Sequence, residues 1–139
     1  MATSALSPVS VAVYGLLNVS GLTTLATGGV YDDVPQGTAF PYVWYEVQEQ
    51  DRRGLGTGGL PEVALRVHTF STYQGMSQAQ SINAKVIELL KDQALTVSGY
   101  AMCGHVFYDE SVLLLDQDLN GVKVNELVAL FRAFVEQTA

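Results

Sequence analysis

This sequence of 139 residues has little cysteine, little charge and no long apolar run. Cys103 is the only cysteine, so no disulfide can form within the chain, and we expect a buried thiol in a reducing compartment. No apolar run approaches the roughly 20 residues of a membrane-spanning helix. The first ten residues lack the Lys or Arg of a signal peptide. The sequence therefore predicts a protein made in the cytoplasm, with no membrane contact.

Charged residues make up only 15% of the chain, against about 25% in an average soluble domain, and apolar residues make up 48%. The net charge is −7, and no stripe of Lys and Arg is present. Tight binding to a nucleic-acid backbone is therefore not expected. The low charge density fits a well-packed monomer, or a subunit partly covered by copies of itself or by partners.

The first half of the chain predicts a helix and then a strand hairpin. The helix is expected to start at Ser7-Pro8, with Ser7 at the N-cap, and to end before Gly21. Residues 42–50 and the segment after Pro61 alternate apolar and polar side chains, as strands with one buried face do. The ten residues 51–60 separate them, which predicts an antiparallel hairpin with a long tip.

The second half predicts a second helix and then mostly strand. Ser77-x-x-Gln80 is a capping box, and the apolar stripe behind it predicts a helix to about Lys91. Residues 30–31 and 95–97 are expected to be short extended pieces. Residues 103–115 are rich in β-branched and aromatic side chains, which predicts one long strand.

Residues 122–135 fit two structures. Their apolar residues match a helical stripe, and local propensity favours a helix. The same residues alternate as a strand would, and Asn120-Gly121, at the end of an expected turn over residues 116–121, favours a hairpin with the preceding strand. The pattern alone leaves this segment open.

A glycine-rich run is the first candidate site. Residues 54–59 match G-x-G-x-x-G, but a dinucleotide site needs a helix start directly after the glycines, and here Pro61 and a strand follow. We interpret the run as a loop that contacts a partner; a tolerated surface insertion is the alternative. The candidate contact residues are Arg52, Arg53, Gly54, Leu55, Gly56, Thr57, Gly58 and Gly59.

Two further patterns could bind a metal ion. Asp116-x-Asp118-x-Asn120-Gly121 matches the first half of an EF-hand loop, but Leu127 stands where the bidentate Glu belongs. Cys103 and His105 could contribute to a zinc site, yet the three or four ligands that zinc needs are not apparent. We therefore expect no metal site and no cofactor.

Catalytic patterns are also scarce. Asp109 and Glu110 are adjacent, so on a strand they should point to opposite faces, which argues against joint acid–base work. His68 and His105 are the only histidines, and we interpret both as sheet histidines with satisfied hydrogen bonds. Trp44 is interpreted as core or subunit interface. The sequence predicts no catalytic residue and no enzyme.

A resemblance to a known family enters with residues 29–46, GVYDDVPQGTAFPYVWYE. This stretch resembles the signature of the siphophage tail-completion (tail-terminator) family: a short Val-Tyr piece, a Pro-Gln-Gly loop, then Pro-Tyr opening a strand. Residues 63–71 resemble the family's second strand. The helix from Ser77 and the pattern from Gly121-Val122 to Phe131-Arg132 fit in order, so the resemblance covers about residues 8–136.

The resemblance implies an α+β fold: one domain over residues 1–139, with loose termini at 1–6 and 137–139. It implies an antiparallel sheet of about four main strands with two helices packed against it, and makes residues 122–135 a strand. It also implies a structural virion protein that forms a ring, usually a hexamer, at the head-proximal end of a phage tail. Such a ring stops tube polymerisation and joins the tail to the head connector.

The same resemblance implies partners and a location. The partners would be further copies of the chain, the major tail-tube protein and the head-tail connector or neck proteins, with genomic DNA passing through the lumen unbound. The protein would be found in the virion tail or neck, and in the host cytoplasm during assembly. Two alternatives stay open: another small neck or head-tail connector protein, and a small cytoplasmic α+β binding module.

Overall fold

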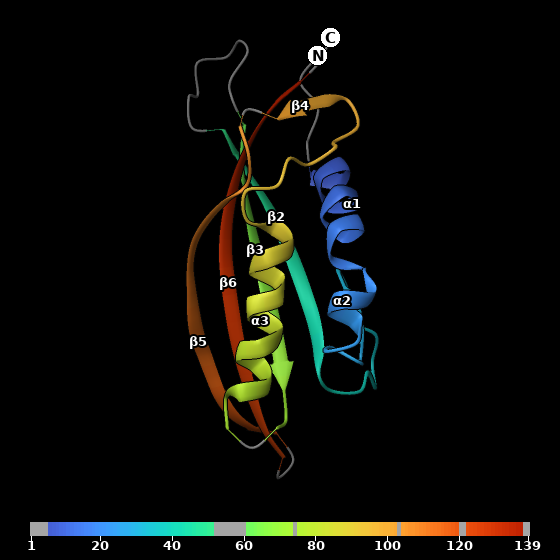
Figure 1. The fold of residues 1–139 in the computed structure, drawn as a ribbon, viewed down its shortest axis with the longest axis vertical. Coiled ribbons are helices and arrows are strands. Elements are labelled where there is room, and N and C mark those ends of the chain that lie inside the picture. The colour runs from blue at the N-terminus through green and yellow to red at the C-terminus, as the bar shows by residue number, and fades with distance from the viewer. Residues whose placement is uncertain (1–5, 52–60, 74, 103, 120–121, 138–139) are drawn as a thin grey trace.

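The computed structural model describes residues 6–51, 61–73, 75–102, 104–119 and 122–137. Within these ranges, three helices and six strands follow one another (Figure 1). They are α1 (Leu6–Leu17), α2 (Ser20–Thr23), β1 (Val30–Tyr31), β2 (Tyr42–Asp51), β3 (Pro61–Ser71), α3 (Ser77–Leu90), β4 (Tyr100–Met102), β5 (Phe107–Leu119) and β6 (Val122–Gln137).

The strands form one sheet in the order β1-β2-β3-β6-β4, and β5 also pairs with β6. The four long strands, β2, β3, β5 and β6, are antiparallel neighbours, as expected. The sheet as a whole is mixed, because β1 runs parallel to β2 over two residues. The expected α+β class is therefore confirmed, and the expected sheet of about four antiparallel strands is corrected to a mixed sheet of six.

Helices α1 and α3 pack on one face of this sheet: α3 contacts β3 and β6, and α1 contacts β2 and α3; Figure 1 shows α3 in front of the strands and α1 to its right. Their apolar stripes meet the alternate residues of the long strands, since side chains of a strand alternate between its two faces. Fully buried members of this core include Val9, Val13, Val43, Val63, Leu65, Val67, Ile82, Val86, Ala129 and Phe131. The hydrophobic core is thus a single layer between helices and sheet.

The C-terminal segment is a strand along its whole length. Strand β6 pairs with β3 on one side and with β5 on the other, so its backbone groups are satisfied within the sheet. Phe131 pairs with Leu65 on β3 and with Tyr108 on β5, and it lies in the core. These two ladders explain why a segment with helical propensity becomes a strand, because tertiary pairing overrides local propensity.

The strand predicted over residues 103–115 is displaced. Strand β5 begins only at Phe107 and continues to Leu119, so residues 116–119, predicted as a turn, belong to the ladder with β6. The short strand β4 was not predicted; it pairs with the end of β6, where Met102 is opposite Val135. The extended piece expected at residues 95–97 is not in a strand, whereas residues 30–31 form β1 as predicted.

Both helix starts differ from the prediction. Helix α1 already includes Leu6 and Ser7, so Ser7 is not its N-cap; it ends at Leu17, before Gly21 as predicted, and Gly21 lies in the separate short helix α2. In α3 the N-cap is Met76, without a side-chain hydrogen bond. The capping box is therefore not formed, and Ser77 is the first helical residue. Residues 1–5 and 138–139 of the expected loose termini lie outside the described residues.

Gly28 fixes the turn that leads into β1. A Cβ atom at this position would lie 1.9 Å from the carbonyl oxygen of Ala39 and 2.7 Å from that of Pro41. The Gly28 N–H donates to the carbonyl of Pro41 at 2.8 Å, so the two chain segments touch backbone to backbone. Only glycine permits this approach, which brings β1 beside the start of β2.

Candidate interaction surface

The face of the sheet opposite α1 and α3 is covered by no described helix. We call it the open face. Its side chains come from the strand positions that alternate with the core positions, and they are aromatic and charged as well as aliphatic. They are Tyr42, Trp44, Glu46 and Gln48 of β2, Ala64, Arg66, His68 and Phe70 of β3, and Glu126, Val128, Leu130, Arg132 and Phe134 of β6.

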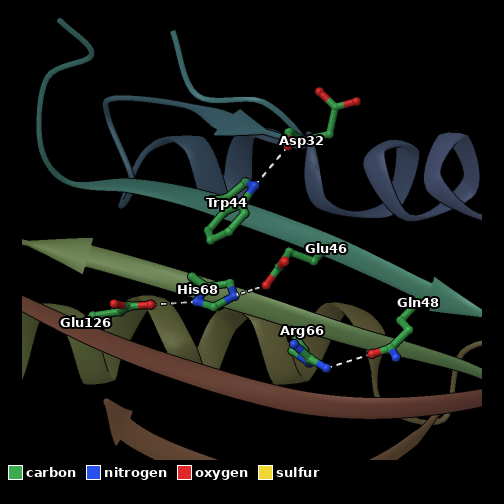
Figure 2. Close-up of polar contacts among 7 residues, drawn as sticks. All are labelled: Asp32, Trp44, Glu46, Gln48, Arg66, His68 and Glu126. Atoms are coloured by element: carbon green, nitrogen blue, oxygen red, sulfur yellow. Dashed lines mark hydrogen bonds and ion pairs between the residues drawn. The ribbon is translucent and has the colours of Figure 1, made fainter. Parts of the chain in front are cut away.

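A histidine between two carboxylates lies at the centre of this face (Figure 2). The Nε2 atom of His68 is 2.6 Å from Oε2 of Glu46, and its Nδ1 atom is 2.6 Å from Oε2 of Glu126. Both ring nitrogens of His68 thus lie within hydrogen-bond distance of a carboxylate oxygen. His68 thereby connects β2 and β6 across β3.

The two glutamates differ in exposure. The side chain of Glu126 is 11% exposed and that of Glu46 is 36% exposed, while the His68 side chain is 7% exposed. A carboxylate removed from water depends more strongly on its partner than one that water can still reach. The Glu126–His68 contact should therefore contribute more to stability than the Glu46–His68 contact.

Aromatic rings cover the histidine and continue the cluster. The ring of Trp44 stacks on His68 with centroids 4.4 Å apart, and its indole N–H donates to the backbone carbonyl of Asp32 at 2.9 Å. Figure 2 shows this indole beside the histidine. Tyr42 stacks on Phe70 with centroids 5.0 Å apart. Trp44, which the sequence predicted to lie in the core or at a subunit interface, is half-buried on the open face.

Two arginines bind side chains of neighbouring strands. Arg66 Nη2 donates to Oε1 of Gln48 at 2.7 Å, as Figure 2 shows. Arg132 Nε lies 2.9 Å and 3.0 Å from the two carboxylate oxygens of Asp109. These contacts satisfy both arginines of the open face within the subunit.

Two tyrosines on β2, the half-buried Tyr42 and the buried Tyr45, have raised pKa values. Burial raises the pKa of Tyr42 above its ordinary value of 10.0, and the negative charge of Glu126 raises it further. Burial also raises the pKa of Tyr45, which lies on the helix-covered face; a hydrogen bond from Ser10 opposes this shift, and Asp32 and Tyr14 add to it. Both phenols are therefore held neutral near pH 7.

The described residues contain no group of three or more His, Cys, Asp or Glu side chains arranged to hold a metal ion. The cluster around His68 shows why, since its two glutamates bind opposite nitrogens of one ring and do not converge on a common point. His105 lies at the surface, with Nε2 3.3 Å from Oδ1 of Asp92. Cys103, its suggested metal partner, lies outside the described residues.

The other sequence-predicted residues are placed as follows. A β-bulge between Tyr108 and Glu110 brings the carboxylate of Asp109 to Arg132, so the simple alternation expected for Asp109 and Glu110 does not hold. Residues 116–119 are paired strand rather than a calcium loop. The candidate contact loop, residues 52–59, lies outside the described residues; the strand β3 follows it, as predicted.

The sequence of this chain matches the model of a known protein family. The model of the family described as tail completion protein gp17 matches residues 11–136. The chain belongs to this family. It is therefore a structural protein of a bacteriophage tail, located in the virion, and not an enzyme. No match was found among curated proteins.

Two solved structures share the fold. A chain in the virion of a native gene transfer agent particle superposes with a TM-score of 0.76 and 22% identity, covering 96% of this chain and 99% of that one. The gp17 protein of bacteriophage SPP1 gives a TM-score of 0.57 and 18% identity, covering 93% and 88% of the two chains. The mixed sheet with helices on one face is thus the fold of both proteins.

Sequence reasoning missed the pairing of Glu46 and Glu126 with His68. Both glutamates are isolated acids on strands, which ordinarily point to water, and Glu46 fits a polar position of the alternation in residues 42–50. The signal is the register: His68 lies opposite Trp44 on β2 and Val128 on β6, which places each glutamate diagonally next to the histidine. That register becomes visible only once the order of strands is known.

Proposed function

We propose that this chain is a tail-terminator subunit, which forms a ring on the head-proximal end of the tail tube, stops its polymerisation and joins the tail to the head connector. The observation that carries the proposal is membership of the tail-completion family over residues 11–136. The likeness to a chain of a gene transfer agent virion supports it at the level of fold. The partners are the tail-tube protein, the connector proteins and further copies of the chain.

The ring requires a heterologous contact repeated around an axis, since two-fold pairing alone cannot close a ring of six. The surface fits a subunit with neighbours, because large apolar side chains lie exposed on α1 and on β5. They are Leu6, Val11 and Tyr14 on one side and Phe107, Val112 and Leu113 on the other. The acidic net charge of −7 fits a lumen through which DNA passes without binding.

Deleting the gene from its phage tests the proposal against the other neck roles. A terminator controls tube length, so particles lacking it should contain tails of irregular length that are not joined to heads. Another neck or connector protein would instead leave tails of normal length that fail to join. Electron microscopy distinguishes the two outcomes, and wild-type chain supplied from a plasmid is the control. Cryo-microscopy of the intact neck should then show a closed ring of copies at the tube end.

We further propose that residues 52–59 contact a neighbouring ring or the lumen. Asp51 pairs with Pro61, and the nine residues between them exceed what a hairpin needs; a shorter turn would close β2 and β3 at lower entropic cost. Arg52 and Arg53 offer two charges for an acidic partner.

Replacing residues 53–59 with Asn-Gly should leave the Tm unchanged or slightly raised. The same variant should fail to join tails to heads or give tails of irregular length. A shortened-loop phage that forms plaques at wild-type efficiency would instead favour a tolerated insertion.

A further inference from the structure

One edge of the sheet has only a short neighbour. Strand β1 pairs with β2 at two positions, where Val30 is opposite Val43 and Tyr31 is opposite Trp44. Strand β2 continues to Asp51, and within the described ranges no strand pairs with this edge beyond Trp44. The edge from Tyr45 onward is therefore available to a further strand; we call it the β2 edge.

The direction of the backbone groups on this edge follows from one hydrogen bond. The Val43 N–H donates to the carbonyl of Gly29 at 2.9 Å, so the backbone N–H and C=O groups of Val43 point away from β3. Backbone groups alternate along a strand, so Tyr45 and Val47 direct their N–H and C=O groups to the same side as Val43. Trp44 and Glu46 direct theirs toward β3. Unpaired groups at regular spacing are the template on which an added strand binds.

A groove runs beside the β2 edge. It has a volume of about 580 Å³, and a second hollow of about 400 Å³ continues it along α1. Its walls include Leu6, Ser10 and Val11 of α1, Tyr45 and Val47 of β2, and Asp32. Val11 is 71% exposed and Tyr14, in the second hollow, is 41% exposed. Apolar side chains thus line the place where an added strand would lie.

The charge of this groove is negative. Asp32 and Glu46 line it, and no Lys or Arg is among its lining residues. The carboxylate of Glu46 is shared with His68, whereas Asp32 is exposed at the end of β1. A segment that places apolar side chains at alternate positions and carries a Lys or Arg would therefore match both the walls and the charge.

The opposite edge of the sheet is built differently. Strand β5 has two irregularities in its register with β6, between Tyr108 and Glu110 and between Leu113 and Leu115, and it carries Asp109 and Glu110. Bulges and acidic side chains are common ways of protecting an edge strand from pairing. The register of β2 with β3 is unbroken from Tyr42 to Asp51. Of the two edges, the β2 edge is the one suited to strand addition.

We propose that the β2 edge binds an extended, basic segment of another virion protein, which adds as a strand beside Tyr45 and Val47 and packs on Val11. This inference rests on the proposed function, since it assigns one contact by which the subunit is held in the neck. The binding mode is strand addition, in which backbone hydrogen bonds supply affinity and alternate side chains supply specificity.

Amide hydrogen exchange, resolved to single residues, tests the backbone part of the proposal. The free subunit and purified particles are compared. The N–H groups of Tyr45 and Val47 should exchange at least about tenfold more slowly in particles, while those of Trp44 and Glu46, which face β3, serve as internal controls that are protected in both. Equal exchange of Tyr45 and Val47 in the two samples would overturn the proposal.

Two variants test the same site without relying on exchange. Val47→Pro removes an N–H from the β2 edge and leaves the ladder with β3, since proline is tolerated on an edge strand. Val11→Arg places a cation against a basic segment, and Leu25→Arg alters another exposed apolar side chain that does not line the groove.

Val47→Pro and Val11→Arg should reduce incorporation into particles at least about tenfold, and the control Leu25→Arg should incorporate as the wild type does. Normal incorporation of both test variants would overturn the proposal. A ring seen in the neck with freely exchanging Tyr45 and Val47 would overturn it while leaving the proposed function intact. Protection of the same amides in a dimer of the free subunit would overturn it in favour of a second copy as the occupant.

Discussion

On the face of the sheet that α1 and α3 cover, the buried side chains are mostly apolar, and Leu65 and Phe131 are each 1% exposed. The alternate residues of the same strands point to the open face. There, His68 lies between Glu46 and Glu126 and stacks against the ring of Trp44. The covered face is stabilised by the removal of apolar surface from water. The open face is held by charge pairing and ring stacking, which define particular partners. The first arrangement buries apolar area, and the second pairs polar side chains with one another within the subunit.

Phe131 and Leu130 give the sharpest test of this contrast, because they are neighbours on β6 whose side chains point to opposite faces of the sheet. Phe131→Ala should lower the free energy of unfolding by about 3–5 kcal/mol, the range for a large side chain removed from a core. Leu130→Ala should lower it by roughly 1–2 kcal/mol, since the half-buried side chain removes less apolar area from water. Urea unfolding measures both. Equal losses would show that the open face is buried as deeply as the core.

The charged cluster provides the next test. Glu126→Gln should cost about 1.5–3 kcal/mol, as expected for a hydrogen bond to a charged group that is largely shielded from water. Glu46→Gln, at the more exposed carboxylate, should cost about 1 kcal/mol or less. The measurement is urea unfolding near pH 7, with His68→Gln combined with each variant in a double-mutant cycle. A larger loss at Glu46 than at Glu126 would contradict the ranking by burial.

Much of the covered face could be predicted from the sequence. The alternation in residues 42–50 and after Pro61 predicted β2, β3 and their hairpin, and the apolar stripe after Ser77 predicted α3, because both patterns report burial of one face. The ends of elements were less predictable. Ser77 has the right residue type for a cap, yet Gln78 accepts a hydrogen bond from Ser71 in the neighbouring segment, a tertiary contact that no local pattern reveals.

The open face could not be predicted in the same way. Residues 122–135 fit a helix and a strand equally well by pattern, and only their resemblance to the family made them a strand. The position of Glu126 beside His68 depends on that choice and on the order β2-β3-β6. The strand β4 was missed because its three residues pair only with the end of β6, far along the chain. A local sequence pattern does not reveal which distant strands pair with each other.

The smallest expected effect concerns Tyr42 on the open face and Tyr45 on the covered face, and it appears only at alkaline pH. Burial raises the pKa of both phenols in the folded state above the ordinary value of 10.0. A raised folded-state pKa means that the contribution to stability is present below about pH 10 and is lost as the pH rises through the folded pKa. Stability should therefore fall above pH 10, and Tyr42→Phe and Tyr45→Phe should each reduce that fall.

The two tyrosines differ in how they should respond to Glu126→Gln. The charge of Glu126 contributes to the raised pKa of Tyr42 and is not among the causes of the shift at Tyr45. Following phenolate absorbance with pH, Glu126→Gln should lower the pKa of Tyr42 toward its ordinary value and leave that of Tyr45 unchanged. Tyr45→Phe and Tyr42→Phe backgrounds assign each signal to one residue. A shift of the same size at both would mean that the charge of Glu126 acts across the sheet, and the two faces would then not be electrostatically separate.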